Sequence, residues 1–159
     1  NSSWDKFNSD LNLVIEKRDD LLTNVGLCHI DMHPHNVLIN NTSVSAILDF
    51  ESFLIAPTES VILFNLFKLA RQSIVFDLNV MHNNSINMIL QSVLNELKKQ
   101  DLIRDLDKND VVIMAKVEVI RRILIILDLS FYNNVSTWNH VLSIQLNALY
   151  EIDALFNDI

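Results

Sequence analysis

The sequence predicts a mainly helical α+β fold, formed as a single domain over residues 1–159. Glycine and proline, which most often interrupt helices, are confined to the first 57 positions, where the one glycine is Gly26 and the two prolines are Pro34 and Pro57. The remaining residues, 58–159, contain neither and are rich in leucine, isoleucine and asparagine, which predicts several helices. Half of the residues are hydrophobic, enough for a sizeable core in a chain of this length.

One helix is expected at the N-terminus. Ser2 or Ser3 can cap its first turn, because a serine oxygen accepts a hydrogen bond from a free backbone N–H group. Large apolar residues then recur at roughly helical spacing, which indicates a buried stripe. The stripe consists of Trp4, Phe7, Leu11, Val14 and Leu21.

Short apolar segments follow the first helix and predict a small amount of β-structure. They lie at 25–28, 37–39 and 44–48, and they are short enough for strands. The polar residues 40–43 between the last two segments are typical of a tight turn. This part of the sequence therefore predicts a β-hairpin.

Four helices are expected after Pro57. The first directly follows the proline, the second begins near Ser85 and ends by Lys99, the third covers about 109–129, and the last begins at Thr137. The expected apolar face of the first is Val61, Phe64, Leu66, Phe67 and Leu69, and that of the last is Trp138, Val141, Leu142, Leu146, Leu149 and Ile152. The expected polar links are residues 83–84, 105–109 and 132–136.

The charge balance argues against a nucleic-acid partner. Twelve basic residues face 20 acidic ones, a formal net charge of −8, whereas nucleic-acid binding needs a basic surface. The acidic surface suits either a cationic substrate or simply solubility. The single cysteine fits a reducing compartment, and the longest aliphatic run, 123–127, is too short to cross a membrane. With no secretion signal visible at the N-terminus, we expect a cytoplasmic protein that makes no membrane contact.

Three polar residues, each beside an apolar run, indicate chemistry. Asp31 precedes Asn36 by five residues, and Asp49 follows thirteen residues later. A carboxylate can accept a proton from a hydroxyl, and amide and carboxylate oxygens are the hard ligands that Mg²⁺ prefers. This grouping suits a magnesium–nucleotide complex.

The wording of two segments resembles one enzyme family. Residues 29–38 read His-Ile-Asp-Met-His-Pro-His-Asn-Val-Leu, and residues 47–51 read Ile-Leu-Asp-Phe-Glu. The pattern is similar to the catalytic and metal-binding loops of the aminoglycoside phosphotransferase and choline kinase family, distant relatives of protein kinases. The resemblance is strong over 25–51, and the order of helices elsewhere resembles the C-terminal lobe of these kinase-like phosphotransferases, with the β-hairpin at the catalytic loop.

The resemblance implies a role for each matching position. Asp31 corresponds to the general base that deprotonates the acceptor hydroxyl, and Asn36 and Asp49 correspond to the two Mg²⁺ ligands. Leu48 would pack under the adenine of ATP, and His29 would stabilise the loop inside the lobe. The implied activity is ATP-dependent transfer of the γ-phosphoryl group to a hydroxyl of a small molecule, such as an aminoglycoside-, choline- or sugar-like compound.

Three departures from the family pattern matter. Ile30 stands where the aminoglycoside branch prefers glycine, and residues 58–61 read Thr-Glu-Ser-Val, where the family has an Asp-Leu pair that helps to anchor the catalytic loop. With one glycine in all, no glycine-rich loop can cover the phosphates. We therefore expect the chain to be a C-terminal catalytic and substrate-binding lobe without its N-terminal nucleotide lobe, and inactive alone.

Two other interpretations remain open from the residues. His29, Asp31, His33 and His35 alternate, so that in an extended strand they would face one side and form the metal site of a hydrolase, although Pro34 disrupts a regular strand. Alternatively, the domain is a non-catalytic, pseudokinase-like module. In either kinase-like interpretation, the apolar surface that faces an N-terminal lobe would be exposed and would favour self-association.

Overall fold

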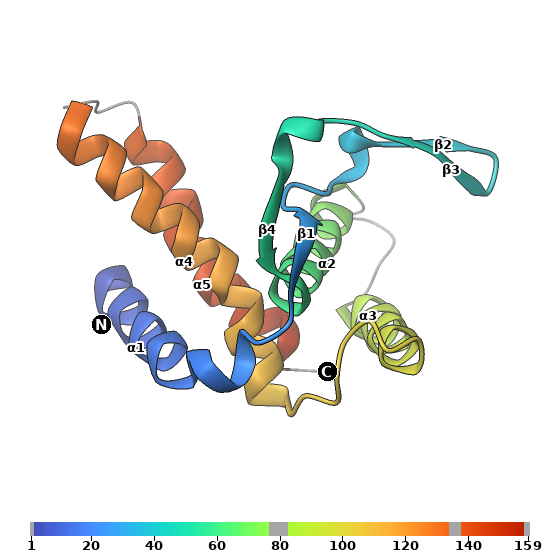
Figure 1. Ribbon diagram of the computed structural model, residues 1–159, viewed down its shortest axis with the longest axis horizontal. Helices are drawn as coiled ribbons and strands as arrows, with labels where there is room; N and C mark the ends of the chain where they lie inside the picture. Colours follow the sequence, from blue (N-terminus) through green and yellow to red (C-terminus); the bar gives the residue numbers. More distant parts are fainter. Residues whose placement is uncertain (1, 77–82, 134–137, 158–159) are drawn as a thin grey trace.

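The computed structural model describes residues 2–76, 83–133 and 138–157. It confirms a mainly helical α+β fold. Among the described residues, no helix combines the length and the apolar character needed to span a membrane. The helices are α1 (Ser3–Leu21), α2 (Thr58–Phe76), α3 (Asn83–Lys99), α4 (Lys108–Asn133) and α5 (Asn139–Phe156) (Figure 1).

The first helix begins where the sequence predicted. Ser2 is its N-cap, and its Oγ accepts a hydrogen bond from the Asp5 N–H at 3.2 Å. The Asp5 carboxylate accepts in return from the Ser2 N–H at 2.8 Å. This reciprocal capping box satisfies two N–H groups that the helix itself cannot pair. The expected Thr137 start of the last helix lies outside the described residues, as do positions 134–136 of the expected polar link.

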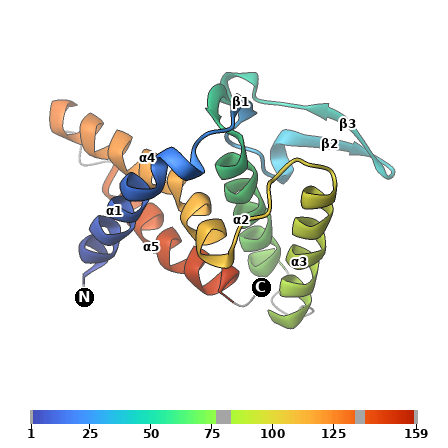
Figure 2. The same ribbon diagram turned by 60° about the horizontal axis from the view of Figure 1, so that its bottom comes forward.

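The helical core is built around α4, which packs against α1, α2 and α5 (Figures 1 and 2). On α2, the expected Phe64 and Phe67 are buried, but Leu69 is 37% exposed and Leu63 is fully buried instead. The prediction for Leu69 was wrong because the buried stripe follows positions 63, 67 and 70, and position 69 lies off this arc. The most deeply buried side chains are Leu63, Met114, Val119, Ile123, Leu149 and Ile152.

The strands form two separate antiparallel pairs. The predicted hairpin is confirmed as β2 (Val37–Asn40) and β3 (Ser43–Ile47). The other pair joins β1 (Val25–His29) to β4 (Phe53–Pro57). The sequence did not predict β4, although its aromatic and β-branched residues favour a strand. Pro57 is tolerated there because it is the last residue of the strand.

The β2–β3 hairpin extends away from the helical body, as both views show (Figures 1 and 2). Its apolar side chains Leu38, Ile39 and Val44 are exposed. The outward face of the β1–β4 pair is exposed as well, with Leu27 directly opposite Ile55 in the register. The opposite face of this pair is covered, because Cys28 and Ala56 pack against Val61 of α2.

A polar cluster crosses the helical body. The buried Lys116 of α4 binds Asp10 of α1 at 3.0 Å and Asp153 of α5 at 2.5 Å, and Lys6 contacts the same two carboxylates at 2.9 and 2.6 Å. Burial lowers the pKa of Lys116 despite these contacts. Burial would also lower the pKa of Lys6, but the hydrogen bonds of this less buried lysine prevail and raise it. Four alternating charges therefore hold α1, α4 and α5 in register.

Removing one of these charges should destabilise the fold. In Lys116→Met, the buried carboxylate of Asp10 loses one of its two cations, and we expect the free energy of unfolding to fall by about 3 kcal/mol. Urea unfolding followed by circular dichroism measures this change. The matched control is Lys99→Met at an exposed position, for which a loss below about 1 kcal/mol is expected. Equal losses in the two variants would show that the cluster does not stabilise the fold.

Candidate functional site

The three residues that the sequence selected lie together although they come from different loops. Asp31 follows β1 by two residues, Asn36 ends a 3₁₀ turn (Pro34–Asn36) before β2, and Asp49 lies between β3 and β4. The side-chain N–H₂ of Asn36 donates to the Asp31 carbonyl at 3.0 Å and lies 3.4 Å from Asp49 Oδ2. The hairpin places both loops at its base, which explains how residues so far apart in sequence meet.

His29 links these two loops. Its imidazole is buried and packs edge-on against Phe53, with the ring centroids 4.9 Å apart. Nδ1 accepts a hydrogen bond from the Asp31 N–H at 3.2 Å, so Nε2 carries the hydrogen and donates it to the Leu48 carbonyl at 2.9 Å. His29 thus holds the backbone of Leu48, which precedes Asp49, at a fixed position relative to the backbone of Asp31, the candidate base. The expectation that it stabilises the loop is confirmed.

Asp49 adopts a left-handed backbone conformation, with φ +63° and ψ 55°. Such a conformation costs about 1–3 kcal/mol in a residue other than glycine and is typical of functional sites. Ser52 compensates by donating its N–H to the Asp49 carbonyl at 3.0 Å and its Oγ–H to Asp49 Oδ2 at 2.6 Å. Within the described part of the chain Oδ1 of Asp49 has no hydrogen bond, so it is available to a cation. Sequence reasoning missed Ser52.

The carboxylate of Asp31 has two different environments. Oδ1 accepts from Lys68 of α2 and from Arg122 of α4, the latter at 3.2 Å. Oδ2 has His33 Nε2 3.5 Å away. Burial would raise the pKa of Asp31, but the adjacent Lys68 and Arg122 outweigh burial and hold it below the usual range. Asp31 is therefore ionised at neutral pH, with Oδ1 held by hydrogen bonds and Oδ2 without one among the described residues.

Neither Lys68 nor Arg122 was recognised from the sequence. They lie 37 and 91 residues after Asp31, each on a helix that otherwise reads as an apolar stripe. No local pattern distinguishes them from ordinary charged positions on a helix, because only the packing of α2 against α4 brings them to the loop.

The loop that carries Asp31 is anchored to the helices although residues 58–61 lack the family's Asp-Leu pair. Asn65 of α2 donates its side-chain N–H₂ to the His29 carbonyl at 3.0 Å, and Arg122 donates to the Ile30 carbonyl at 3.0 Å. Glu59, near where the family has its aspartate, is buried and instead accepts from the N–H of Arg104 at 2.7 Å. The loop is anchored by residues further along the chain than the family pattern suggests.

Asn36 and Asp49 fit a magnesium–nucleotide complex by their chemistry. Mg²⁺ is usually held by one or two protein oxygens, with nucleotide phosphates and water completing six ligands, and these two residues can supply an amide and a carboxylate oxygen. Leu48, which would lie under the adenine, is 39% exposed, and its N–H is fixed by the Asn36 carbonyl at 2.8 Å. The side chain of Leu48 is thus accessible from solvent on a rigid backbone.

The hydrolase interpretation finds no support in the geometry. It requires one extended strand through four alternating residues, but β1 ends at His29 and a 3₁₀ turn begins at Pro34. Both nitrogens of His29 are used in hydrogen bonds to the backbone. The rings of His33 and His35 lie close, with centroids 5.4 Å apart. Over residues 2–76, 83–133 and 138–157, no three His, Cys, Asp or Glu side chains are placed to hold a metal ion.

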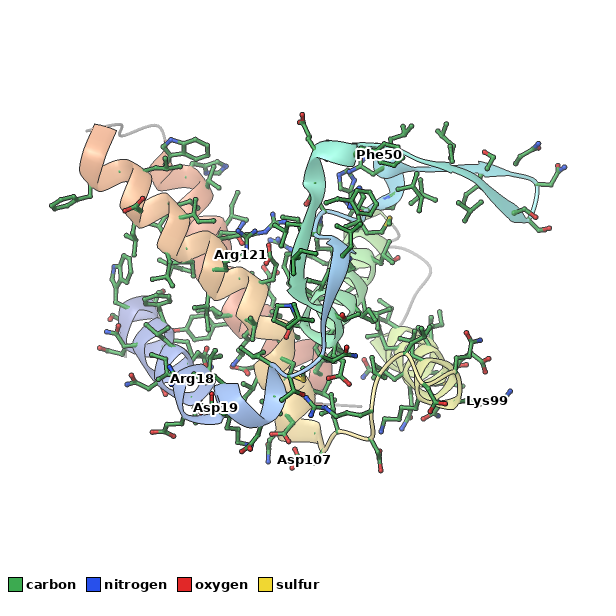
Figure 3. All side chains as sticks on the ribbon, viewed as in Figure 1. Arg18, Asp19, Phe50, Lys99, Asp107 and Arg121 are labelled. Atoms are coloured by element: carbon green, nitrogen blue, oxygen red, sulfur yellow. The ribbon has the colours of Figure 1, made fainter. Side chains whose placement is uncertain are left out.

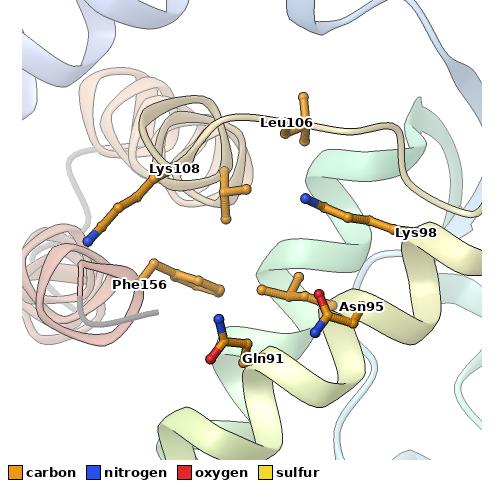
Figure 4. A pocket seen from close by; sticks show the side chains of 8 residues that line it. Gln91, Asn95, Lys98, Leu106, Lys108 and Phe156 are labelled. Atoms are coloured by element: carbon orange, nitrogen blue, oxygen red, sulfur yellow. The ribbon is translucent and has the colours of Figure 1, made fainter.

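A hollow of about 150 Å³ lies elsewhere, between α3, the start of α4 and the end of α5 (Figure 4). Its apolar lining includes Leu106 and Phe156, and its two cations are Lys98 and Lys108. Lys98 is bound to Asp105 at 2.7 Å, and Lys108 donates to the carbonyl of Asn157. Both lysines are therefore engaged in contacts within the fold.

Comparison with known proteins supports the family resemblance. The model of the phosphotransferase enzyme family matches residues 3–59, fewer than half of the 159 residues but including Asp31, Asn36 and Asp49. The resemblance to the aminoglycoside phosphotransferase and choline kinase family is thereby confirmed, and phosphotransferase activity is the activity that it suggests. No curated protein and no solved structure gave a significant match. Lys68 and Arg122 lie beyond the matched residues.

The electrostatics of this site can be tested at His33. Burial and the neighbouring Lys68 lower the pKa of His33, whereas Asp31 raises it, so that the ring is neutral at pH 7. Lys68→Met removes a positive charge and frees Asp31, and both effects favour imidazolium. We therefore expect the pKa of His33 to rise in this variant, measured by NMR titration of the histidine ring signals. Lys99→Met is the control, with no expected change; a fall in Lys68→Met would contradict the geometry.

Proposed function

We propose that the protein is an ATP- and Mg²⁺-dependent phosphotransferase that transfers the γ-phosphoryl group to a hydroxyl of a small molecule. The observation that carries the proposal is the position of the ionised Asp31 next to the Asn36–Asp49 pair, within loops that match the phosphotransferase enzyme family. The contacts of the site suggest a separate role for each of these residues.

Asp31 would orient the acceptor and take its proton through Oδ2. Its other oxygen is held by Lys68 and Arg122, so the carboxylate has a fixed direction. A carboxylate whose pKa is lowered is a weak base. That suits phosphoryl transfer, because its transition state is loose and depends on positioning and electrostatic stabilisation more than on prior deprotonation.

Asn36 and Asp49 would hold Mg²⁺ against the nucleotide phosphates, and Leu48 would contact the adenine. A Mg²⁺ ion held by these residues would supply positive charge that offsets the negative charge developing on the phosphate oxygens. Residues 1–159 contain one glycine and so provide no glycine-rich loop over the phosphates. We therefore propose that they act as the C-terminal catalytic and substrate-binding lobe, and that alone they bind nucleotide weakly and are inactive.

The metal site gives the sharpest test of this function. With AMP-PNP present, we expect Mn²⁺, a paramagnetic substitute for Mg²⁺, to broaden the amide NMR signals of Asn36, Leu48 and Asp49 in the wild-type chain. Asp49→Asn removes the charged ligand and should weaken this Mn²⁺ binding at least about tenfold. NMR detects binding in the millimolar range, so a weak site suffices.

Glu51→Gln is the matched control for Asp49→Asn. Glu51 is exposed, lies two residues away and carries the same charge, so its loss changes the general electrostatics by a similar amount. Broadening that disappears equally in both variants would indicate diffuse attraction of Mn²⁺ to an acidic surface. Broadening that persists unchanged in Asp49→Asn would contradict the assignment of the metal site.

We also propose that the protein associates with a second copy of itself through the exposed face of the β1–β4 pair. This sheet packs one face against α2 and presents Leu27 and Ile55 side by side on the other, 69% and 68% exposed. Burying such a face against its own copy in a symmetric dimer removes apolar surface from both.

Sedimentation velocity over a hundredfold range of concentration tests this association. We expect the wild-type chain to sediment faster at high concentration, and the double variant Leu27→Glu with Ile55→Glu to remain monomeric because it would bury charge. Ile15→Glu, at an exposed apolar position on α1, is the control and should associate as the wild type does. A wild-type chain that stays monomeric throughout would contradict the proposal.

A further inference from the structure

Positive charge is concentrated beside Asp31 in a chain that is acidic overall. The carboxylate of Asp31 is paired with Lys68 and Arg122. The carboxylate of Glu118 is paired with Arg121 and Arg122. Three cations thus face two carboxylates, a local excess of one positive charge, whereas the whole chain carries −8. Arg121 lies on the side of α4 that faces β4 (Figure 3), while Phe50 marks the base of the hairpin in the same view.

The cations are held rigidly. The buried ring of Phe64 lies beneath two of them, 5.7 Å from Lys68 Nζ and 4.9 Å from Arg122 Cζ. Glu118 is buried and accepts two hydrogen bonds of 2.7 Å from Arg121 and one of 3.0 Å from Arg122. Aromatic support and a buried carboxylate fix the direction of these groups before any ligand arrives.

The same cations have unused hydrogen-bonding capacity. The Lys68 ammonium has three N–H donors, and its hydrogen bond in the described structure is to Asp31 alone. Arg122 uses Nε and one terminal nitrogen, which leaves its other terminal nitrogen free among the described residues. Their side chains are 16% and 25% exposed, so an anion from solvent can reach them. Partly buried cations with free donors bind oxyanions well.

We propose that Lys68 and Arg122 form an oxyanion-binding site for the acceptor, so that the substrate carries a carboxylate or phosphate in addition to its hydroxyl. This rests on the proposed function, because that function places the hydroxyl at Asp31 Oδ2. An acceptor anion at the two cations would hold the molecule beside the base. A cationic amine, by contrast, would face two like charges at the same place.

The proposed oxyanion site and the candidate metal ligands come from different parts of the fold. Lys68 and Arg122 come from α2 and α4 and contact Oδ1 of Asp31, whereas His33 contacts Oδ2. Asn36 is bound to Asp49 and to the Asp31 carbonyl, on the loop side. The oxyanion site is therefore formed by side chains of the helices, whereas the candidate metal ligands lie in the loops. It also lies outside the part of the chain that matches the family.

Three small probes that differ in charge test the proposal. Glycerate, glycerol and choline each carry a hydroxyl, and their binding to the 159-residue chain is measured by NMR chemical-shift titration. We expect saturable binding of glycerate and much weaker binding of the other two. Lys68→Met should weaken glycerate binding about tenfold or more, as expected for the loss of a charged hydrogen bond. Lys99→Met should have no effect. Glycerate binding no tighter than glycerol binding, or equally reduced by both variants, would overturn the proposal.

Asp31→Asn makes the test independent of folding losses, because the expected effect is a gain. Removing the carboxylate that competes for Lys68 and Arg122 should tighten glycerate binding several-fold, whereas an anion bound elsewhere would be unaffected and would overturn the proposal. Saturating Mg²⁺–AMP-PNP should leave glycerate affinity intact. Competition between them would assign the cations to the nucleotide phosphates and overturn the acceptor site. Glycerate binding without any nucleotide binding would instead refute the proposed function and leave the oxyanion site in place.

Discussion

The arrangement of the site depends on the neutral imidazole of His29. One nitrogen accepts the N–H of Asp31, and the other donates to the carbonyl of Leu48, so a single buried ring sets the distance between two loops 19 residues apart. The imidazolium form could not accept the first hydrogen bond, because both ring nitrogens would then be donors. The backbone carbonyl of His29 is in turn held by Asn65. The loops are positioned relative to each other first, and to the helices second.

Charged side chains form two clusters in the described part of the molecule, one within the helical body and one beside Asp31. In the helical body, Lys6 and Lys116 alternate with Asp10 and Asp153, and every member finds partners of opposite sign. This set balances two positive with two negative charges and fixes the register of the helices. Beside the loop, three cations face the carboxylates of Asp31 and Glu118, so that positive charge is in excess. Both clusters are built on the same helix, α4, and they differ in this balance of charge.

The sequence was sufficient wherever the information is local. The capping serine, the hairpin, the five helices and the grouping of Asp31, Asn36 and Asp49 all follow from spacing and residue type over short stretches. It was insufficient where packing decides. β4 was recognised only by its pairing with β1, and Leu69 differs from Leu63 only in its angle around α2. Lys68 and Arg122 belong to the same category, because they reach Asp31 only once α2 and α4 pack together.

In the proposed function, the choice of acceptor would depend on residues beyond the part of the chain that matches the family. The residues that match the family end at position 59 and include the proposed base, the two proposed metal ligands and the histidine that holds their loops together. The groups that would distinguish one acceptor from another come from helices beyond that point. Changing Lys68 would mainly alter the electrostatics, whereas changing Arg122 would also release the Ile30 carbonyl of the loop. Changing Phe64 beneath them would disturb the core as well. In this proposal, acceptor specificity depends on the exposed ends of residues whose stems support the fold.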